Sequence, residues 1–331
     1  RSMFKPDADL RLDFVYGYDG LECAARNVFV TADPNKVVYC AAAVAVVHDA
    51  ARDEQAHFRG HTRDITCLTL CDAEVTVGGV TYPPKTLCAT GQKVPSADAA
   101  SYVDDEEEGD AADAADAADA PPRPFVSVWD VRTLREVARV RLSMDARAVA
   151  GVAFSPDGAT LVTVGCDNNH TVQVWDWRVA RVGEPRPSLK KSSKNAHPND
   201  SFGDSGGRSK TRAPAPKKLR GLLHENTGFK ERPGGVFGVE FDPFASDGAG
   251  DDAIAKRFVS YGKKHVKSWS LLGKTNEWVS RPMSFGAFGV QDVCAVAFLP
   301  PSSREHRNGG KNVLGGNGTA SLVTGHPDGS L

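Results

Sequence analysis

The hexapeptide TVQVWD at residues 171–176 decides the fold, because close copies of it recur along the chain. FVSVWD occupies residues 125–130, and HVKSWS occupies residues 265–270. In these copies apolar side chains recur at a period of two, which is typical of a half-buried β-strand. Each copy therefore predicts the strand that ends a repeated unit.

Two further strands precede the tryptophan strand in each unit. The pattern V-x-x-V-x-F-x-P predicts the first of them at residues 149–156, 236–243 and 293–300. A Pro-Asp-Gly or Asp-Pro sequence then supplies a turn. The predicted middle strands lie at residues 86–91, 160–165, 257–262 and 321–325. Almost no segment has a helical pattern, so the sequence predicts an all-β protein built from repeats.

Three insertions interrupt the strand pattern. Residues 93–124 contain acidic side chains and Asp-Ala-Ala copies, residues 181–220 are rich in Lys and Arg, and residues 300–318 are polar. Such compositions cannot bury enough apolar surface to form a core. We therefore expect exposed, low-complexity loops at all three places.

Composition and charge exclude several classes of protein. The chain has 331 residues, with 40 Lys and Arg against 42 Asp and Glu, and its net charge of −2 offers no general attraction to nucleic acid. No apolar run approaches the ~20 residues that cross a bilayer, and no signal-peptide core follows the first residues. The cysteines are scattered without a C-x-x-C pair, which predicts reduced thiols in the core rather than a zinc site. These features favour a cytoplasmic protein without a membrane segment or a metal.

The sequence also lacks the motifs of common enzymes. It contains no Gly-x-Ser-x-Gly elbow, Walker loop, His-Glu-x-x-His or dinucleotide fingerprint. We therefore predict no catalytic residues, no cofactor and no small-molecule substrate. An enzyme remains the weakest of three hypotheses.

The repeated units resemble WD repeats, the four-stranded blades of a β-propeller. Gly60-His61 matches the dipeptide that opens such a repeat. The resemblance implies that the structural residues of the repeats are His61, Trp129, Trp175 and Trp269. In WD repeats this histidine, a turn aspartate and the tryptophan form a buried hydrogen-bonded network. Gly91-Gln92 stands in place of the turn aspartate, and the later units lack Gly-His, so we expect the network to be incomplete.

The N-terminal segment narrows the resemblance to one family. The string LRLDFVYGYDG at residues 10–20, followed by VVYCAA at 37–42 and HFRGH at 57–61, resembles the echinoderm microtubule-associated protein-like family. The resemblance implies a hydrophobic motif and first blade at residues 1–58 and divergent WD repeats at residues 59–331. Four to five blades are then present in an incomplete ring, and a longer protein would add further blades and a coiled coil outside this fragment.

The N-terminal motif itself has an alternating pattern, with large apolar residues on one side of a predicted strand. We expect this face to be buried and structural, and the resemblance implies a place where two propellers join. A direct ligand-binding role for the aromatic face is the alternative. The residues of the face are Leu10, Leu12, Phe14, Tyr16 and Tyr18.

The resemblance implies tubulin and microtubules as partners and the cytoskeleton as location, with a cilium or flagellum as a further possibility. Tubulin has an acidic surface, so a cationic loop would speed the encounter and add salt-sensitive affinity. The alternative is that the basic segment is only a solvated insertion. A WD-repeat scaffold for a non-tubulin signalling or ciliary complex is the second functional hypothesis. The candidate partner-binding residues are Lys190, Lys191, Lys194, Arg208, Lys210, Arg212, Lys217, Lys218 and Arg220.

Overall fold

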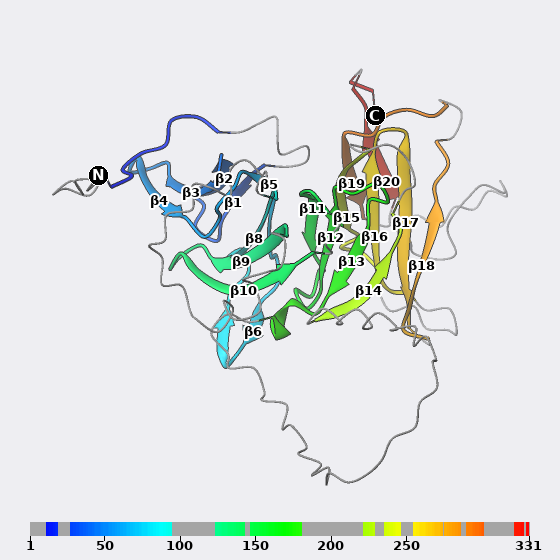
Figure 1. Cartoon of the computed structure of the whole chain (residues 1–331), viewed down its shortest axis with the longest axis horizontal. Coiled ribbons are helices and arrows are strands. Elements are labelled where there is room, and N and C mark those ends of the chain that lie inside the picture. The colour runs from blue at the N-terminus through cyan, green and yellow to red at the C-terminus, as the bar shows by residue number, and fades with distance from the viewer. Residues whose placement is uncertain are drawn as a thin grey trace, which may run out of the picture.

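The chain forms an arc of small antiparallel sheets (Figure 1). The structure is a computed structural model that describes residues 11–18, 27–94, 123–142, 146–180, 221–228, 235–245, 254–273, 275–285, 289–300, 321–327 and 329–330. Four sheets have four strands each. In the described ranges the only helical element is the short 3-10 turn η3 (Trp177–Val179). The predicted all-β architecture, an incomplete β-propeller, is therefore confirmed.

The first sheet has the strand order β1-β2-β3-β4, in which each strand pairs with the next one along the chain. Its strands are joined by tight turns, and Ala42 between β2 and β3 has a φ of 49°. The strands are β1 (Val28–Val30), β2 (Lys36–Ala41), β3 (Val44–Asp49) and β4 (Glu54–Phe58).

The second sheet has the order β10-β9-β8-β5, and a separate hairpin interrupts it between β5 and β8. The hairpin strands are β6 (Val75–Val77) and β7 (Val80–Tyr82), and Val75 and Val77 are buried in the core shared with the third sheet. The sheet consists of β5 (Ile65–Leu70), β8 (Leu87–Gln92), β9 (Phe125–Asp130) and β10 (Arg135–Arg141).

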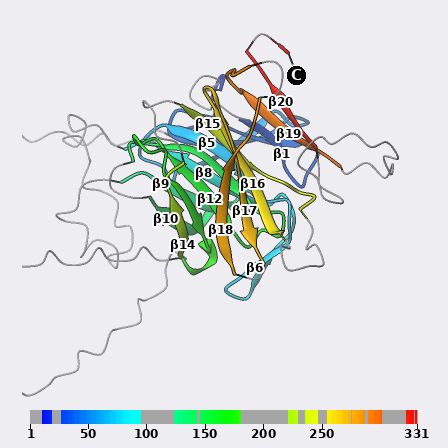
Figure 2. The ribbon, with the colours of Figure 1, turned by 90° about the vertical axis from the view of Figure 1, so that its right-hand side faces the viewer.

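The third and fourth sheets repeat the same plan, and a pair of strands follows them. Figure 2 shows β16, β17 and β18 of the fourth sheet side by side. The third sheet contains β11 (Val149–Phe154), β12 (Leu161–Gly165), β13 (Val172–Trp175) and β14 (Leu222–Asn226). The fourth contains β15 (Val236–Phe241), β16 (Ile254–Gly262), β17 (His265–Leu272) and β18 (Glu277–Pro282), and the final pair is β19 (Ala295–Leu299) and β20 (Ser321–Gly325).

The Pro-Asp-Gly turn after β11 forms as its residue types require. Ser155 Oγ donates to Asp157 Oδ1 over 2.5 Å, and the backbone N–H of Thr160 donates to Ser155 Oγ over 2.9 Å. Gly158 has a φ of +67°, which suits glycine because it lacks a Cβ. The turn thus directs the chain from β11 back into β12.

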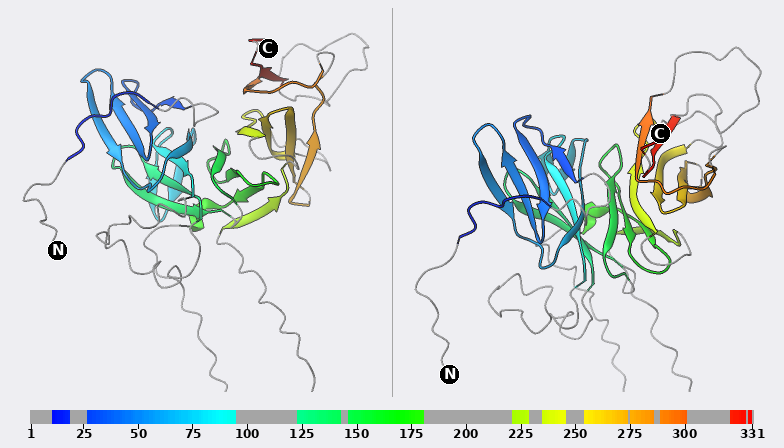
Figure 3. Two further views of the ribbon diagram at one scale, coloured as in Figure 1. Left: turned by 45° about the horizontal axis from the view of Figure 1, so that its top comes forward. Right: turned by 90° about the horizontal axis from the view of Figure 1, so that it is seen from above.

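The core lies between consecutive sheets rather than at one centre. Separate clusters of buried side chains join the first sheet to the second, the second to the third, the third to the fourth, and the fourth to the final pair. Phe58 of β4 stacks on Trp129 of β9 with ring centroids 4.5 Å apart. A Cβ added to Gly151 of β11 would lie 3.2 Å from the Gly238 Cα of β15, so glycine permits the close approach of these strands. Each sheet is therefore held by its immediate neighbours, and the first sheet and the final pair form the two ends of the arc (Figure 3).

The N-terminal motif corrects one expectation. Residues 11–18, which we call the strap, contain no strand. Leu12, Tyr16 and Tyr18 are 37%, 89% and 60% exposed, so the predicted buried face is wrong for these three side chains. Phe14 is half-buried, and Leu10 lies outside the described residues. The physical reason is that the strap lies on one sheet only, and no second layer in the described chain covers its aromatic side.

The described cysteines are free thiols, and the predicted place in the core is correct for four of them but wrong for Cys294. Cys40, Cys67, Cys71 and Cys88 are buried, Cys166 is half-buried and Cys294 is exposed. Burial raises the pKa of the Cys71 thiol to about 11. Burial also raises the pKa of the Cys88 thiol. The thiols of Cys71 and Cys88 are therefore protonated and inert at neutral pH.

Candidate functional site

The tryptophan of the second sheet ends a buried chain of hydrogen bonds. Trp129 Nε1 donates to Thr90 Oγ1 over 3.1 Å, and Thr90 Oγ1 lies 2.6 Å from His61 Nε2. His61 Nδ1 lies 2.9 Å from Gln92 Oε1, which also accepts from the Thr62 backbone N–H. Because an amide oxygen only accepts, Nδ1 carries the proton, and the Thr90 hydroxyl donates to Nε2. Gln92 thus takes the position of the missing turn aspartate. The sequence pattern did not show that Gln92 could replace this aspartate in the network.

The third and fourth sheets contain shorter versions of this network. Trp175 Nε1 donates to Thr163 Oγ1, and Trp269 Nε1 donates to Ser260 Oγ, each over 3.0 Å. Ser260 Oγ lies 3.0 Å from Nε2 of His265, at the start of β17. The network of the fourth sheet therefore contains a histidine although that unit lacks a Gly-His dipeptide. Of the three networks, the one in the third sheet consists of a tryptophan and a hydroxyl group.

These histidines are neutral parts of the core. Burial lowers the pKa of His61 to about 4, despite the opposing hydrogen bond with Gln92, and Arg139 lowers it further. Burial, with Lys267 and His170, likewise lowers the pKa of His265 to about 4. Buried imidazoles that are neutral and hydrogen-bonded within the fold do not face a ligand. The repeat residues thus hold the sheets together, and a functional surface must be sought elsewhere.

The strap is fixed to the first sheet by its main chain. The Val15 N–H donates to Gln55 Oε1 over 2.7 Å, and Gln55 Nε2 donates to the Val15 carbonyl over 3.1 Å. Gln55 Nε2 also donates to the Tyr39 hydroxyl. The glutamine side chain thus forms the pair of hydrogen bonds that a neighbouring β-strand would form. Its position in β4 gave no sequence signal for this role.

Aromatic contacts complete the attachment of the strap. Phe14 packs edge-on against His48 of β3 with centroids 5.8 Å apart, and Tyr18 packs edge-on against Tyr39 of β2 at 6.4 Å. Tyr16 touches only Phe14 among these rings, at 4.8 Å. The strap therefore presents Tyr16 outward from a rigid sheet.

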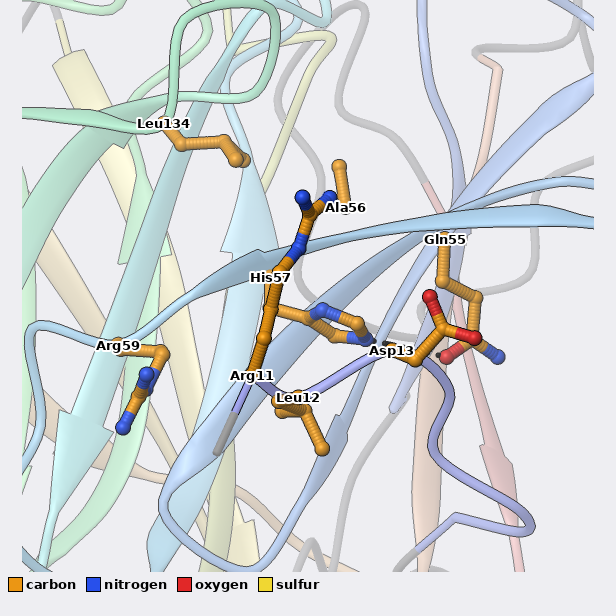
Figure 4. A pocket seen from close by; sticks show the side chains of 8 residues that line it. All are labelled: Arg11, Leu12, Asp13, Gln55, Ala56, His57, Arg59 and Leu134. Atoms are coloured by element: carbon orange, nitrogen blue, oxygen red, sulfur yellow. Dashed lines mark hydrogen bonds between the residues drawn. The ribbon is translucent and has the colours of Figure 1, made fainter. Parts of the chain in front are cut away.

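A pocket of about 340 Å³ opens between the strap and β4 (Figure 4). We call it the strap pocket. Its volume lies in the range of small-ligand sites. Burial and the nearby Arg59 lower the pKa of His57 in its wall, against the opposing effect of Asp13. The lining residues are Arg11, Leu12, Asp13, Gln55, Ala56, His57, Arg59 and Leu134.

The candidate partner-binding lysines and arginines, from Lys190 to Arg220, lie outside the described residues, as do the acidic residues 95–122. Their role stays a prediction. In the part of the chain that the structure describes, no group of three His, Cys, Asp or Glu side chains is placed to hold a metal ion. No helix among the described residues is both long and apolar enough to cross a membrane.

Two family models match the chain. Residues 5–46 match the HELP motif, and residues 141–176 match the WD domain, G-beta repeat. The first match spans the strap and much of the first sheet, and the second spans β11 to β13 and ends beside Trp175.

Curated proteins support the same assignment over part of the chain. Echinoderm microtubule-associated protein-like 2 of Rattus norvegicus is 33% identical over 174 residues, which cover 52% of this chain and 22% of that protein. Echinoderm microtubule-associated protein-like 1 of the same organism is 29% identical over 199 residues, or 59% of this chain and 20% of that protein. The 77 kDa echinoderm microtubule-associated protein of Lytechinus variegatus is 30% identical over 175 residues, or 52% and 21%.

The chain spans about a fifth of the length of these relatives, since the matches cover 20% to 22% of them. The similarity nevertheless coincides with a specific motif, with a repeat model and with a propeller-like arrangement of sheets. The chain carries a HELP motif and WD repeats, and over 52% of its length it is similar to echinoderm microtubule-associated protein-like proteins.

Proposed function

We propose that this chain is part of a microtubule-associated structural protein that docks on tubulin through its WD-repeat propeller. The observation that carries the proposal is the HELP motif at residues 5–46, joined to WD-type sheets and similar to proteins named as microtubule-associated. A location on the cytoskeleton follows from the same reasoning.

The structure supports docking over catalysis. The sheets form a rigid frame that carries loops on its edges, which suits the recognition of a large protein surface. The two histidines with the most strongly lowered pKa values are enclosed in tryptophan networks and cannot reach a substrate. WD repeats and the named relatives point to a structural or scaffold protein rather than an enzyme.

Co-sedimentation with polymerised tubulin, repeated in rising salt, tests the proposal. We expect pelleting at low salt that weakens as salt screens the charges. Failure to pellet at low salt would reject tubulin docking by this chain. A pull-down that recovers other proteins without tubulin would then favour the WD-repeat scaffold.

The basic insertion is tested by deleting residues 181–220. If its lysines and arginines contact tubulin, the deletion weakens pelleting and flattens the dependence on salt. Deletion of the polar residues 301–318 is the control, because that insertion carries three basic side chains against the eleven of residues 181–220. Equal affinity and an equal salt slope after both deletions would show that the basic segment is only a solvated loop.

A further inference from the structure

The strap pocket has a basic lining that the described fold does not neutralise. Arg11 enters from the strap and Arg59 follows the end of β4. Both side chains are exposed, and neither forms an ion pair or a hydrogen bond with another residue of the described chain. Asp13 is the one carboxylate in the lining. Two guanidinium groups against one carboxylate leave the pocket positive.

His57 in the wall of the strap pocket is neutral, and its N–H is engaged by Gln55. Its Nε2 lies 3.2 Å from Gln55 Oε1, which only accepts, so Nε2 carries the proton. Because burial and Arg59 lower the pKa of this histidine, the ring is neutral at neutral pH. Its protonated Nε2 is turned to the glutamine that holds the strap. The guanidinium groups are therefore the donors available to a ligand.

The two arginines do not converge on one point. In Figure 4 the Arg11 side chain runs toward Ala56 and Leu134, whereas the Arg59 side chain extends away from both. A single phosphate is held best by donors that point at one centre. Divergent donors match a ligand that carries several carboxylates along its length. Leu12, Ala56 and Leu134 offer apolar contact to the aliphatic parts of such side chains.

We propose that the strap pocket binds an acidic peptide segment, with one carboxylate paired to Arg11 and another to Arg59. The strap supplies one arginine and the residue that follows β4 supplies the other, so the site exists only while Gln55 holds the strap in place. The inference goes beyond the proposed function, since it concerns acidic peptides in general and is tested without tubulin.

Fluorescence anisotropy with a labelled oligoglutamate peptide tests the site on the whole chain. We expect the peptide to bind the wild type and a matched oligoglutamine peptide not to bind. The variant Arg11→Gln/Arg59→Gln should bind at least about tenfold more weakly, because it loses both charge-assisted contacts. Arg281→Gln on β18 removes one exposed positive charge at a distant site and should leave the affinity unchanged. The single variants Arg11→Gln and Arg59→Gln should each lose part of the affinity.

Three outcomes would overturn the proposal. The double variant, with an unchanged unfolding midpoint, could bind the peptide as tightly as the wild type. Arg281→Gln could weaken binding as much as the double variant does, which would indicate general charge attraction. Inorganic phosphate could displace the peptide at a concentration equal to that of the peptide, which would indicate a simple anion site. Peptide binding that depends on both arginines would support the pocket even if the chain failed to pellet with microtubules.

Discussion

At the scale of single residues, a hydroxyl group anchors the tryptophan in one strand of each of three sheets, namely Trp129, Trp175 and Trp269. Thr90, Thr163 and Ser260 accept the indole N–H in the second, third and fourth sheets. All three hydroxyl-bearing residues are fully buried, where an unpaired donor is costly. All three networks contain the hydroxyl group. The histidine that contacts it is His61 in the second sheet and His265 in the fourth, and no histidine of the described chain contacts Thr163 in the third.

Replacing these hydroxyl groups should lower the free energy of unfolding more where the network contains a histidine than where it does not. Thr90→Val leaves the Trp129 N–H and the His61 Nε2 without partners, which should lower the free energy of unfolding by about 2–5 kcal/mol. Thr163→Val leaves only the Trp175 N–H unpaired and should cost about 1–3 kcal/mol. Urea unfolding of both variants measures the difference. Equal losses would contradict a role for His61 in the network.

The same networks predict a loss of stability in acid. His61 and His265 have folded pKa values of about 4, below the unfolded value of about 6.5. Between these limits the unfolded chain binds protons that the folded chain does not, so stability falls as the pH drops from about 6.5 to about 4. The contribution of each histidine is at most on the order of 3 kcal/mol.

Unfolding measured from pH 7.5 to pH 5 checks this slope. His61→Asn removes one titrating group, so its stability should depend less on pH than that of the wild type. An identical slope in the variant would show that His61 does not cause the effect. The range stops at pH 5 because carboxylates titrate below that pH.

Residue types predicted the tryptophans of these networks but not all of their partners. The V-x-V-W pattern marks Trp129 and Trp175 because a strand period is visible in sequence. The roles of Gln92 and His265 in the networks were missed. A side-chain contact depends on where neighbouring strands meet, and the spacing of residues in the WD-repeat pattern does not predict that position. His265 reaches Ser260 across the β16–β17 turn, whereas His61 reaches Thr90 from a distant loop.

At the scale of elements, the strap shows how one side chain can replace a strand. The alternating pattern of residues 10–18 predicts a strand with a buried apolar side, and in residues 11–18 neither the strand nor the burial of Leu12, Tyr16 and Tyr18 is found. It could not show that the segment lies on a sheet with no ladder partner and with Tyr16 in solvent. The β6–β7 hairpin was also missed, because its strands have only three residues each and no repeat precedes them.

Removing the glutamine anchor should release the strap without unfolding the sheets. Gln55→Met keeps the length of the side chain but forms neither hydrogen bond with Val15. We expect faster amide exchange at Val15 and faster proteolysis within residues 11–18, with little change in the global unfolding midpoint. Gln55→Glu is the matched control, since it still accepts from the Val15 N–H and should have an intermediate effect. Unchanged exchange at Val15 in Gln55→Met would show that aromatic contacts alone hold the strap.

At the scale of the whole molecule, the first sheet ends in a strand that carries exposed apolar side chains among the described residues. β1 lies at one end of the first sheet, and its Val28 and Val30 are 47% and 51% exposed. An apolar edge strand tends to pair with another chain. We therefore expect this chain alone to self-associate as its concentration rises.

Val28→Lys/Val30→Lys should reduce that association, because charges on an edge strand disfavour pairing. Sedimentation velocity over a range of concentrations measures the effect. Val80→Lys on the β6–β7 hairpin is the control, since Val80 is equally exposed but lies outside the first sheet. A reduction of the same size in the control would mean that association is not through the edge of β1.

The cysteine thiols differ in exposure, so their reaction with a thiol reagent can report where the sheets separate. Cys294 precedes β19 and is exposed, so a thiol reagent should modify it at once. Cys40 belongs to the first sheet and Cys88 to the second, and both are enclosed between sheets that must separate before either sulfur can react. Labelling times read by mass spectrometry would therefore order the opening events along the arc, and would reveal whether the blades come apart in succession or all together.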